Sequence, residues 1–424
     1  MSGPLPPGPP LPASIQTVLW LARPVGYPTW VARRYGDPHR LCLTFSGDLV
    51  LTADPALVPG VLGLRAEVAS AGEANALLAP LLGSRSLLML DGPEHLRLRR
   101  LLGPAFRGEA VRQHRAAIAD LTRREVARWP RGTPFPLLPR MRALTLEVIL
   151  RVVFGLEAGP RLDLLRRLLV ELLAMGSSWM VLPGARRDLG AWSPWGRFLR
   201  LKARIDALLE EEIAERRRSG PGRGLLAELL VDETHGLGVR DLRDQLLTLL
   251  VAGHETTATT LAWCFELLLR HPEAAERARV DPPYLEAVVR ETLRLRPIFR
   301  MTSRRLRRPL ELGSYHLPPG VSVGAAIYLA HRHPEVYPDP ERFRPERFRG
   351  TTPEPGAWIP FGGGIRRCLG AAFASFEMAV VVGTVLDSVR LRPASETPEP
   401  ISLHAVVLVP GHGTRVVADR APTG

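Results

Sequence analysis

Residues 240–270 (RDLRDQLLTLLVAGHETTATTLAWCFELLLR) restrict the fold more than any other part of the chain. Apolar side chains recur there at three- and four-residue spacing, which predicts one long helix. They also lie on nearly every face of that helix, so we expect it to run through the interior of a core. With 424 residues, of which 46% are apolar, the chain can bury such a helix.

The remaining sequence predicts a mainly α protein with a small β part. Helices are expected at 111–128, 142–154, 161–174, 197–217, 283–296 and from about 369 to 388. A hairpin is expected at 41–53, and short strands at 304–324 and 401–417. Residues 334–367 are a Pro-, Arg- and Gly-rich coil, and a coil of this length usually serves function. We expect one domain over 15–424 after a proline-rich arm at 1–14.

Composition argues against several classes of protein. The net charge is +13, but arginine is spread along the whole chain without zinc-finger spacing, so we expect no nucleic-acid partner. The three cysteines, Cys42, Cys264 and Cys368, are odd in number and widely spaced, which argues against a disulfide framework and fits a reducing cytoplasm. No apolar run approaches the roughly 18–20 residues that span a bilayer, so we expect a soluble chain without a membrane anchor.

Residues 361–370 (FGGGIRRCLG) carry the strongest chemical signal. Three consecutive glycines allow the backbone to turn sharply and to approach another group closely. Cys368 then stands just before a predicted helix, where free N–H groups would lower the pKa of its thiol. From these residues alone, Cys368 is either a metal ligand or nucleophile, or a core cysteine at a glycine-rich turn.

The spacing of Phe361, Gly364, Arg366, Cys368 and Gly370 resembles the haem-binding loop of the cytochrome P450 superfamily. The resemblance implies the P450 fold, with haem b (heme b, iron protoporphyrin IX) between the long central helix and the cysteine loop. It implies that Cys368 is the axial thiolate ligand, that Arg366 binds a haem propionate, and that Phe361 and Gly370 belong to the cofactor site. An axial thiolate donates electron density to iron and favours O–O cleavage.

The central helix contains the polar stretch Ala252-Gly-His-Glu-Thr-Thr257. Glycine and polar side chains are costly inside an apolar helix, so they need a compensating role. Thr256 can donate a hydrogen bond to the carbonyl of Ala252, and a kinked core helix is the alternative to a functional role. The stretch resembles the acid–alcohol pair of the family, which implies that Glu255 and Thr256 are catalytic proton-relay groups. We expect His254 to be structural.

Further basic residues resemble the family's propionate ligands. His95 and Arg99 stand four residues apart, so they share one helix face. They resemble the family's His-x-x-x-Arg segment, and Arg304 aligns with another propionate arginine. Its neighbour Arg305 is the alternative, because the register of the arginines is ambiguous.

A scaffold triad is also predicted. Glu291 and Arg294 are opposite charges at i and i+3 on one helix face. They resemble the family's Glu-x-x-Arg pair, and Arg347 matches the third member. The resemblance implies that the three residues together hold the coil beneath the haem.

By this resemblance, the chain is a haem-thiolate monooxygenase that inserts one oxygen atom from O2 into an apolar small molecule by hydroxylation or epoxidation. No flavin, nicotinamide or iron–sulfur motif is present, so electrons are expected from a ferredoxin-type donor with its NAD(P)H reductase. A basic docking face is expected at Arg342, Arg344, Arg349 and Arg367. A peroxide-driven peroxygenase and a non-enzymatic haem sensor are the alternatives.

The substrate pocket is predicted by the same analogy. It is expected to include the segments 70–88, 176–196 and 403–407, together with Leu250, Ala252, Gly253, Ile298 and Phe299. Ala252 and Gly253 are expected to leave room above the iron. Trp179, Trp192 and Trp195 are either packing residues or pocket residues. We expect a monomeric cytoplasmic protein.

Overall fold

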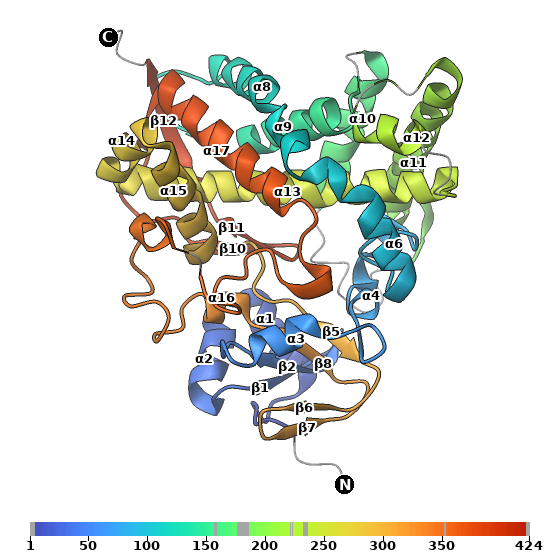
Figure 1. The fold of residues 1–424 in the computed structure, drawn as a ribbon, viewed down its shortest axis with the longest axis vertical. Coiled ribbons are helices and arrows are strands. Elements are labelled where there is room, and N and C mark those ends of the chain that lie inside the picture. Colours follow the sequence, from blue (N-terminus) through green and yellow to red (C-terminus); the bar gives the residue numbers. More distant parts are fainter. Residues whose placement is uncertain are drawn as a thin grey trace.

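The computed structural model describes residues 5–156, 159–175, 186–220, 222, 224–231, 236–351 and 353–420. It confirms the mainly α fold with a small β part. Figure 1 shows a helix-rich body above a smaller part that holds the largest sheet. The first described residues lie at the sheet side and the last described residues at the helical side.

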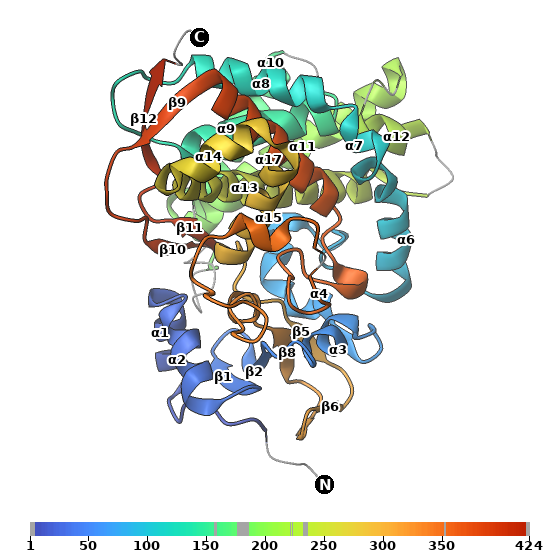
Figure 2. The same cartoon turned by 60° about the vertical axis from the view of Figure 1, so that its left-hand side comes forward.

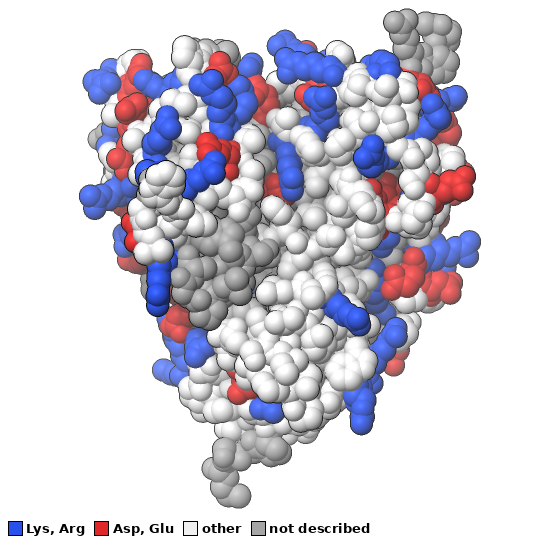
Figure 3. Space-filling model, turned by 180° about the vertical axis from the view of Figure 1, so that it is seen from behind, with Lys and Arg blue, Asp and Glu red and all other residues white. Residues whose placement is uncertain are grey.

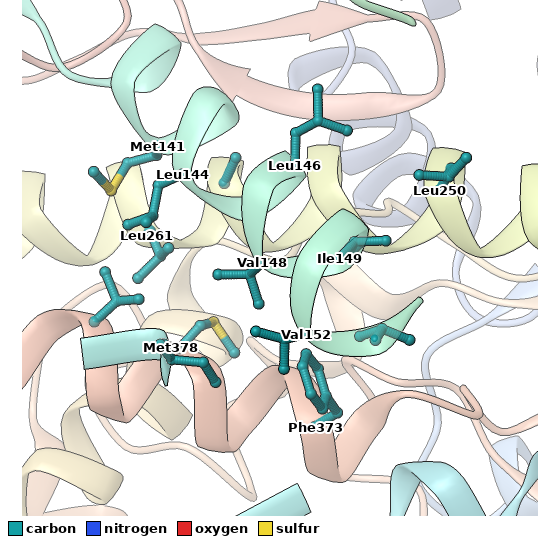
Figure 4. Packing of buried hydrophobic residues seen from close by; sticks show 14 of the residues in the cluster. Met141, Leu144, Leu146, Val148, Ile149, Val152, Leu250, Leu261, Phe373 and Met378 are labelled. Carbon is teal, nitrogen blue, oxygen red and sulfur yellow. The ribbon is translucent and has the colours of Figure 1, made fainter. Parts of the chain in front are cut away.

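The long central helix is α13 (Val239–Arg270), as the sequence predicts. It runs through the helical body in both views of the fold (Figures 1 and 2). Its main neighbours are α9 (Leu138–Val148), α11 (Pro194–Ser219), α15 (Pro282–Leu295) and α17 (Ala371–Ser388). Figure 4 shows Met141 and Leu144 of α9 beside Leu261 of α13. Full burial of each such side chain contributes about 1.5–3 kcal/mol, so this core supplies much of the stability.

Two predicted helices have different boundaries in the structure. The stretch predicted at 111–128 is two helices, α7 (Glu109–Arg112) and α8 (Arg115–Ala127). The stretch predicted at 142–154 begins earlier as α9 and ends in a π-helical turn over Ile149–Val153. In that turn the Phe154 N–H donates to the carbonyl of Ile149 at 2.9 Å, five residues back.

The remaining helices are short or lie outside the core contacts above. They are α1 (Ala13–Ala22), α2 (Gly26–Tyr35), α3 (Val58–Gly63), α4 (Ala71–Ala74), α5 (Ala79–Leu82), α6 (Gly92–Leu102), α10 (Pro160–Ala174), α12 (Leu225–Val231), α14 (Pro272–Val280) and α16 (Ile327–Ala330). Residues 176–185, with Trp179, lie outside the described residues.

The largest sheet has the strand order β1-β2-β8-β5-β3. Its strands are β1 (His39–Leu43), β2 (Gly47–Thr52), β8 (Ser322–Ala325), β5 (Arg304–Leu306) and β3 (Ala69–Ser70). The antiparallel pair β1–β2 is the hairpin predicted at 41–53, and β8 adds parallel to β2. The smaller sheets are β6 (Leu310–Leu312) with β7 (Tyr315–Leu317), β10 (Ile401–His404) with β11 (Val407–Pro410), and β4 (Phe135–Pro136) with β12 (Arg415–Arg420) and β9 (Val389–Pro393).

Helix α17 corrects one expectation from the sequence. Among the described residues it is the one helix long and apolar enough, by length and composition, to cross a membrane. The expectation that no apolar run reaches such a length is therefore wrong. In the fold, α17 packs against α8, α13, α15 and α14, so the apolar residues have a structural use in the protein core.

The predicted triad holds the coil that leads to the cysteine loop. Glu291 and Arg294 are fully buried, and Arg294 donates to the Glu291 carboxylate at 2.7 and 2.8 Å. Arg294 also donates to three backbone carbonyls of residues 331–342. Glu291 accepts the Arg344 N–H at 2.8 Å, and Arg347 Nε lies 3.6 Å from its carboxylate. Removing one partner of a buried pair typically costs about 3–5 kcal/mol, so this contact strongly favours one path for the coil.

His331 provides a second attachment for the same coil. Its ring is fully buried, Nδ1 lies 3.2 Å from the Arg294 carbonyl, and Nε2 accepts the Ile359 N–H at 2.9 Å. Because the Ile359 N–H occupies Nε2, these contacts require the neutral ring with its proton on Nδ1. Burial, followed by the charges of Arg294 and Arg332, lowers the pKa of His331 to about 3.

We predict that His331 weakens the fold as the solution becomes acidic. The unfolded chain takes up a proton near the ordinary histidine pKa of about 6.5, whereas the folded chain does so only near about 3. The contribution of His331 to the free energy of unfolding is therefore complete above pH ~6.5. It is lost as the pH falls from ~6.5 to ~3, by up to ~1.4 kcal/mol per pH unit.

Urea unfolding between pH 7.5 and 4.5 tests this. His331→Gln should be less stable than the native chain at pH 7.5 and should show a shallower loss of stability on acidification. The control His412→Gln alters an exposed histidine and should keep the native slope. Equal slopes for all three proteins would contradict a buried neutral His331.

Candidate functional site

The cysteine loop is shaped by glycines that press against α3. Gly364 has a φ of 60°, and a Cβ at this position would overlap with the backbone carbonyl of Leu62. A Cβ on Gly363 would lie 2.8 Å from the Leu62 side chain. The loop closes where the Cys368 N–H donates to the Phe361 carbonyl at 2.9 Å. The glycines therefore provide both the turn and the close approach that the sequence predicts.

The environment of the Cys368 thiol acts on its pKa in two directions. Burial is the largest effect and raises the pKa. The Gly370 N–H lowers it, as predicted for helix-terminal N–H groups, and the charges of Arg99 and Arg367 act in the same direction. Although the thiol lies among other parts of the protein, Cys368 remains accessible from outside the chain. A bound metal cation would deprotonate such a thiol.

Three arginines gather near this cysteine. Arg99 of α6, Arg304 of β5 and Arg366 of the cysteine loop all have a lowered pKa, and burial is the main cause for each. The pKa of Arg304 falls to about 10, and the charge of Arg366 contributes to lowering the pKa of both Arg304 and Arg99. We call Arg99, Arg304 and Arg366 the arginine cluster. Its members repel one another, so the cluster favours an anionic partner.

His95 extends the same site from α6. Its side chain is 2% exposed, and its Nδ1 is buried without a hydrogen-bond partner among the described residues. Burial and the charges of Arg366 and Arg99 lower the pKa of His95 to about 4, so the ring is neutral near pH 7. A buried ring nitrogen without a partner is rare and indicates an additional polar group in the complete site.

These residues fit the haem that the resemblance implies. Cys368 offers a thiol to iron, the arginine cluster offers positive charge to two propionates, and His95 offers an unused ring nitrogen. The two arginines of β5 have different environments, which favours Arg304 over Arg305 for this role. Arg304 is buried and donates to the Leu62 carbonyl at 2.8 Å, whereas Arg305 points to Ser46 in the hairpin turn.

Glu255 and Thr256, the predicted relay pair, are consecutive residues of α13 and have different hydrogen-bond partners. Thr256 Oγ1 donates to the Ala252 carbonyl at 2.8 Å, as predicted. The Glu255 carboxylate accepts from Arg142 of α9 at 2.5 Å, and the ring of His254 lies 4.0 Å away. His254 itself is buried with Nδ1 3.1 Å from the Leu250 carbonyl, which agrees with a structural role.

Two of the predicted pocket residues on α13 face the core. Leu250 is 1% exposed within the main hydrophobic cluster, and two residues along a helix correspond to about 160° of rotation from Ala252. A Cβ on Gly253 would lie 2.5 Å from the Ile149 side chain, so the π-helical turn that follows α9 occupies the space beside this glycine. Figure 4 shows Ile149 in this turn, near α13. Leu250 therefore packs in the core, Gly253 is half-buried and Ala252 is exposed, and the pocket roles of all three stay predictions.

Other predicted pocket segments are brought together around α13. Ile298 is buried and Phe299 is 37% exposed, and the Ile298 carbonyl accepts the Leu408 N–H at 2.8 Å. This bond places residues 298–299 beside the hairpin that contains 403–407. On the other side, Ser86 bonds to Thr248 of α13 at 2.7 Å, which places part of 70–88 along the same helix.

The two described tryptophans of the predicted segment 176–196, Trp192 and Trp195, have different environments. Trp192 is 96% exposed, and Trp195 stacks on Phe198 with ring centroids 5.1 Å apart. A cavity of about 800 Å³ is lined by residues 83–85 and by residues of α11 and the start of α13. Its lining is highly charged and contains none of the individually predicted pocket residues.

Two residues of the site were missed from the sequence. Asp91 bonds to Arg366. The one feature of the sequence that could have indicated a role for Asp91 is its position shortly before the His95 motif. Arg142 pairs with Glu255 across 113 positions, a separation at which no local pattern can identify a partner.

Comparisons with known proteins agree with this geometry. The family model described as Cytochrome P450 matches residues 6–416. The Mycobacterium tuberculosis protein named cytochrome P450 135B1 is 41% identical over 430 residues, covering 97% of this chain and 91% of that protein. Cytochrome P450 138 of Mycobacterium tuberculosis is 39% identical over 401 residues, covering 92% of this chain and 90% of that protein.

Solved structures show the same fold. The structure of CYP175A1 from Thermus thermophilus matches with a TM-score of 0.77 at 30% identity, covering 96% of this chain and 97% of that one. Retinoic acid bound cyanobacterial CYP120A1 matches with a TM-score of 0.86 at 25% identity, covering 99% of this chain and 100% of that one. The family match along nearly the whole chain, together with the thiol and the arginine cluster, shows that the chain belongs to the cytochrome P450 family.

Proposed function

We propose that this P450 inserts one oxygen atom of O2 into an apolar small molecule, with electrons from a separate ferredoxin-type partner and its NAD(P)H reductase. Family membership establishes the haem-thiolate monooxygenase class, with haem b on an axial cysteine thiolate. When bound, such a haem supplies the activation of dioxygen. The observation that carries the proposal is the carboxylate and hydroxyl pair of Glu255 and Thr256 on α13.

The two side chains support a proton relay in complementary ways. Thr256 lies on the same side of α13 as the exposed Ala252, and its hydroxyl donates to the Ala252 carbonyl. Rotation about χ1 would free this hydroxyl to donate a proton on the side of α13 where Ala252 is exposed. Arg142 holds the Glu255 carboxylate beside the same turn, where it can receive protons from the protein interior or solvent.

An apolar substrate is favoured by the surfaces that frame α13. Phe299 and Val406 are apolar and are 37% and 42% exposed. Ala252 of α13 is exposed as well. Figure 3 shows the face opposite to the view of Figure 1, where few of the described residues near the centre are charged and most charged side chains gather toward the edges. An apolar molecule can approach such a face without stripping water from charges.

The proposed docking site for the electron partner is a group of exposed arginines in the coil and the cysteine loop. Arg342, Arg344, Arg349 and Arg367 are exposed in the coil and cysteine loop. Arg349 lies 3.2 Å from Asp281 and Arg344 lies 3.9 Å from Asp339, whereas Arg342 and Arg367 form no ion pair with a described residue. Unpaired surface cations favour an acidic partner and speed its association. We also propose that the protein acts as a soluble cytoplasmic monomer.

A peroxide-driven reaction is the second candidate. Peroxide delivers its own protons and electrons, so a peroxygenase has little use for a relay on α13. Glu255 and Thr256 therefore favour the O2-dependent reaction.

The carbon monoxide difference spectrum of the reduced protein tests the cofactor assignment. We expect a strongly red-shifted Soret band, because thiolate ligation changes the electronic structure of the haem. Cys368→Ser should lose this band, whereas Cys264→Ser, at a buried cysteine of α13, should retain it. A red-shifted band that persists in Cys368→Ser would overturn the ligand assignment.

Thr256→Ala tests the relay. We expect product formed per NAD(P)H to fall about tenfold or more, with hydrogen peroxide rising to match, because a relay group contributes at least that much to proton transfer. NAD(P)H, peroxide and product are measured with a substrate found by its spin-state shift. Thr257→Ala is the control, since Thr257 is buried and bonds to the Gly253 carbonyl in the same way. Unchanged coupling in Thr256→Ala would exclude the relay role.

Charge reversal tests the docking face. Arg367→Glu and Arg342→Glu should slow the first reduction by ferredoxin at low salt and should flatten its dependence on ionic strength. Arg33→Glu reverses an exposed charge on α2, outside the proposed docking face, and should behave as the native chain. Stopped-flow reduction at several salt concentrations measures both effects. If both docking variants retain the native rates and salt dependence, the partner does not dock on this face.

A further inference from the structure

Asp91 occupies an unusual position at the start of α6. An aspartate at the N-cap of a helix usually accepts hydrogen bonds from the first turn of that helix. Asp91 is the N-cap residue of α6, yet its side chain makes no capping hydrogen bond. Its carboxylate, 14% exposed, instead turns away from α6 and bonds to Arg366 of the cysteine loop.

The protein provides a dedicated set of donors for this carboxylate. The Ser70 hydroxyl donates to Asp91, the Ala71 N–H donates at 3.2 Å, and the Gly72 N–H donates at 3.2 and 3.4 Å to its two oxygens. We call these donors the Asp91 cradle. Gly72 permits the fit, because a Cβ there would lie 3.0 Å from Asp91 Oδ2 and would overlap with the Met89 carbonyl. The carboxylate is therefore held in one orientation, and burial is offset by charge-assisted bonds.

Arg366 depends on the same stretch of chain. Its guanidinium donates to Asp91, to the Leu90 carbonyl and, at 3.2 Å, to the Leu87 carbonyl. The Leu87 N–H in turn donates to Gln245 of α13 at 2.9 Å. Residues 87–91 thus connect the central helix to the cysteine loop, with Asp91 as the only carboxylate in contact with Arg366 among the described residues.

Charge balance gives this contact a consequence for the cofactor. The arginine cluster carries three positive charges in a partly or fully buried site, and burial of unbalanced charge is costly. Two haem propionates supply two negative charges, so they leave one positive charge unmatched. Asp91 supplies the third negative charge, and it is present before any haem arrives. Arg307 also lies 3.8 Å from the Asp91 carboxylate, but it has a closer partner of its own in Glu73, at 2.7 Å.

We propose that Asp91 is a positioning residue for the haem, which orients Arg366 and completes the negative charge that the arginine cluster requires. This inference rests on the assignment of that cluster to the haem propionates. Asp91 favours retention of the cofactor. It also stabilises the ferric state over the ferrous state, because a nearby negative charge opposes the addition of an electron.

The test uses the full-length holoprotein with Asp91→Asn and Asp91→Ala. Asparagine keeps the size of the side chain and one oxygen acceptor but removes the charge. We expect both variants to lose haem to excess apomyoglobin about tenfold faster than the native protein, as loss of one charge-assisted bond implies. Both should also have a more positive midpoint potential. Asp241→Asn is the matched control, because it removes a carboxylate paired with Arg85 at 2.8 Å outside the cluster.

A purely structural role predicts a different pattern. In that case Asp91→Ala would lower the melting temperature, Asp91→Asn would resemble the native protein, and the midpoint potential would not move. That result would overturn the inference. If Asp91→Asn fails to fold, Ser70→Ala weakens the cradle without changing any charge and should shift haem loss in the same direction by a smaller factor. Native haem loss in that variant would also overturn the inference.

The carbon monoxide difference spectrum distinguishes a wrong cofactor assignment from a wrong role for Asp91. A native protein without the red-shifted band would overturn the cofactor assignment itself. A native protein with the band, beside an Asp91→Asn variant with native haem loss and potential, would overturn only the role of Asp91.

Discussion

The buried pair of Glu291 and Arg294 is the interaction on which the rest of the site depends. Removing two charges from water costs several kcal/mol per ion, and only complete partnering offsets that cost. Arg294 achieves it by donating to Glu291 and to three backbone carbonyls of the coil, while Glu291 accepts the N–H of Arg344. One path of the coil satisfies all these bonds. The position of Cys368, farther along the same segment, follows from that path.

The cysteine end of the coil shows the opposite electrostatic condition. There the fold gathers Arg99, Arg304 and Arg366 and leaves His95 with an unused ring nitrogen. Among the described residues, Asp91 is the carboxylate that pairs with this cluster of three arginines. Two haem propionates bound there would complete the charge balance, so the proposed site makes the cofactor part of the energetics of the core as well as of the chemistry. An iron bound to Cys368 would act in the same sense on the thiol, whose pKa is raised by burial.

Much of the architecture was predictable because it depends on local patterns. Helical spacing identified α13 and its length, alternation identified the β1–β2 hairpin, and glycines identified the cysteine loop. Local patterns said less where a neighbour distant in sequence decides the outcome. Ile149 lies against Gly253, and burial by the surrounding protein outweighs the local groups that lower the pKa of Cys368. Helix α17 has the composition of a membrane span because its neighbours in the fold are apolar.

The sequence by itself determined the family and the ion pair of α15, and it marked the candidate cysteine ligand and the candidate relay pair, because each is a short motif with fixed spacing. Only the tertiary structure decided which arginine of β5 is buried beside Leu62, which side of α13 carries the exposed Ala252, and which groups hold Glu255 and Arg366. Those outcomes depend on contacts across more than a hundred residues. Charge, burial and hydrogen bonding at such contacts are properties of the folded arrangement, so no local pattern in the chain encodes them.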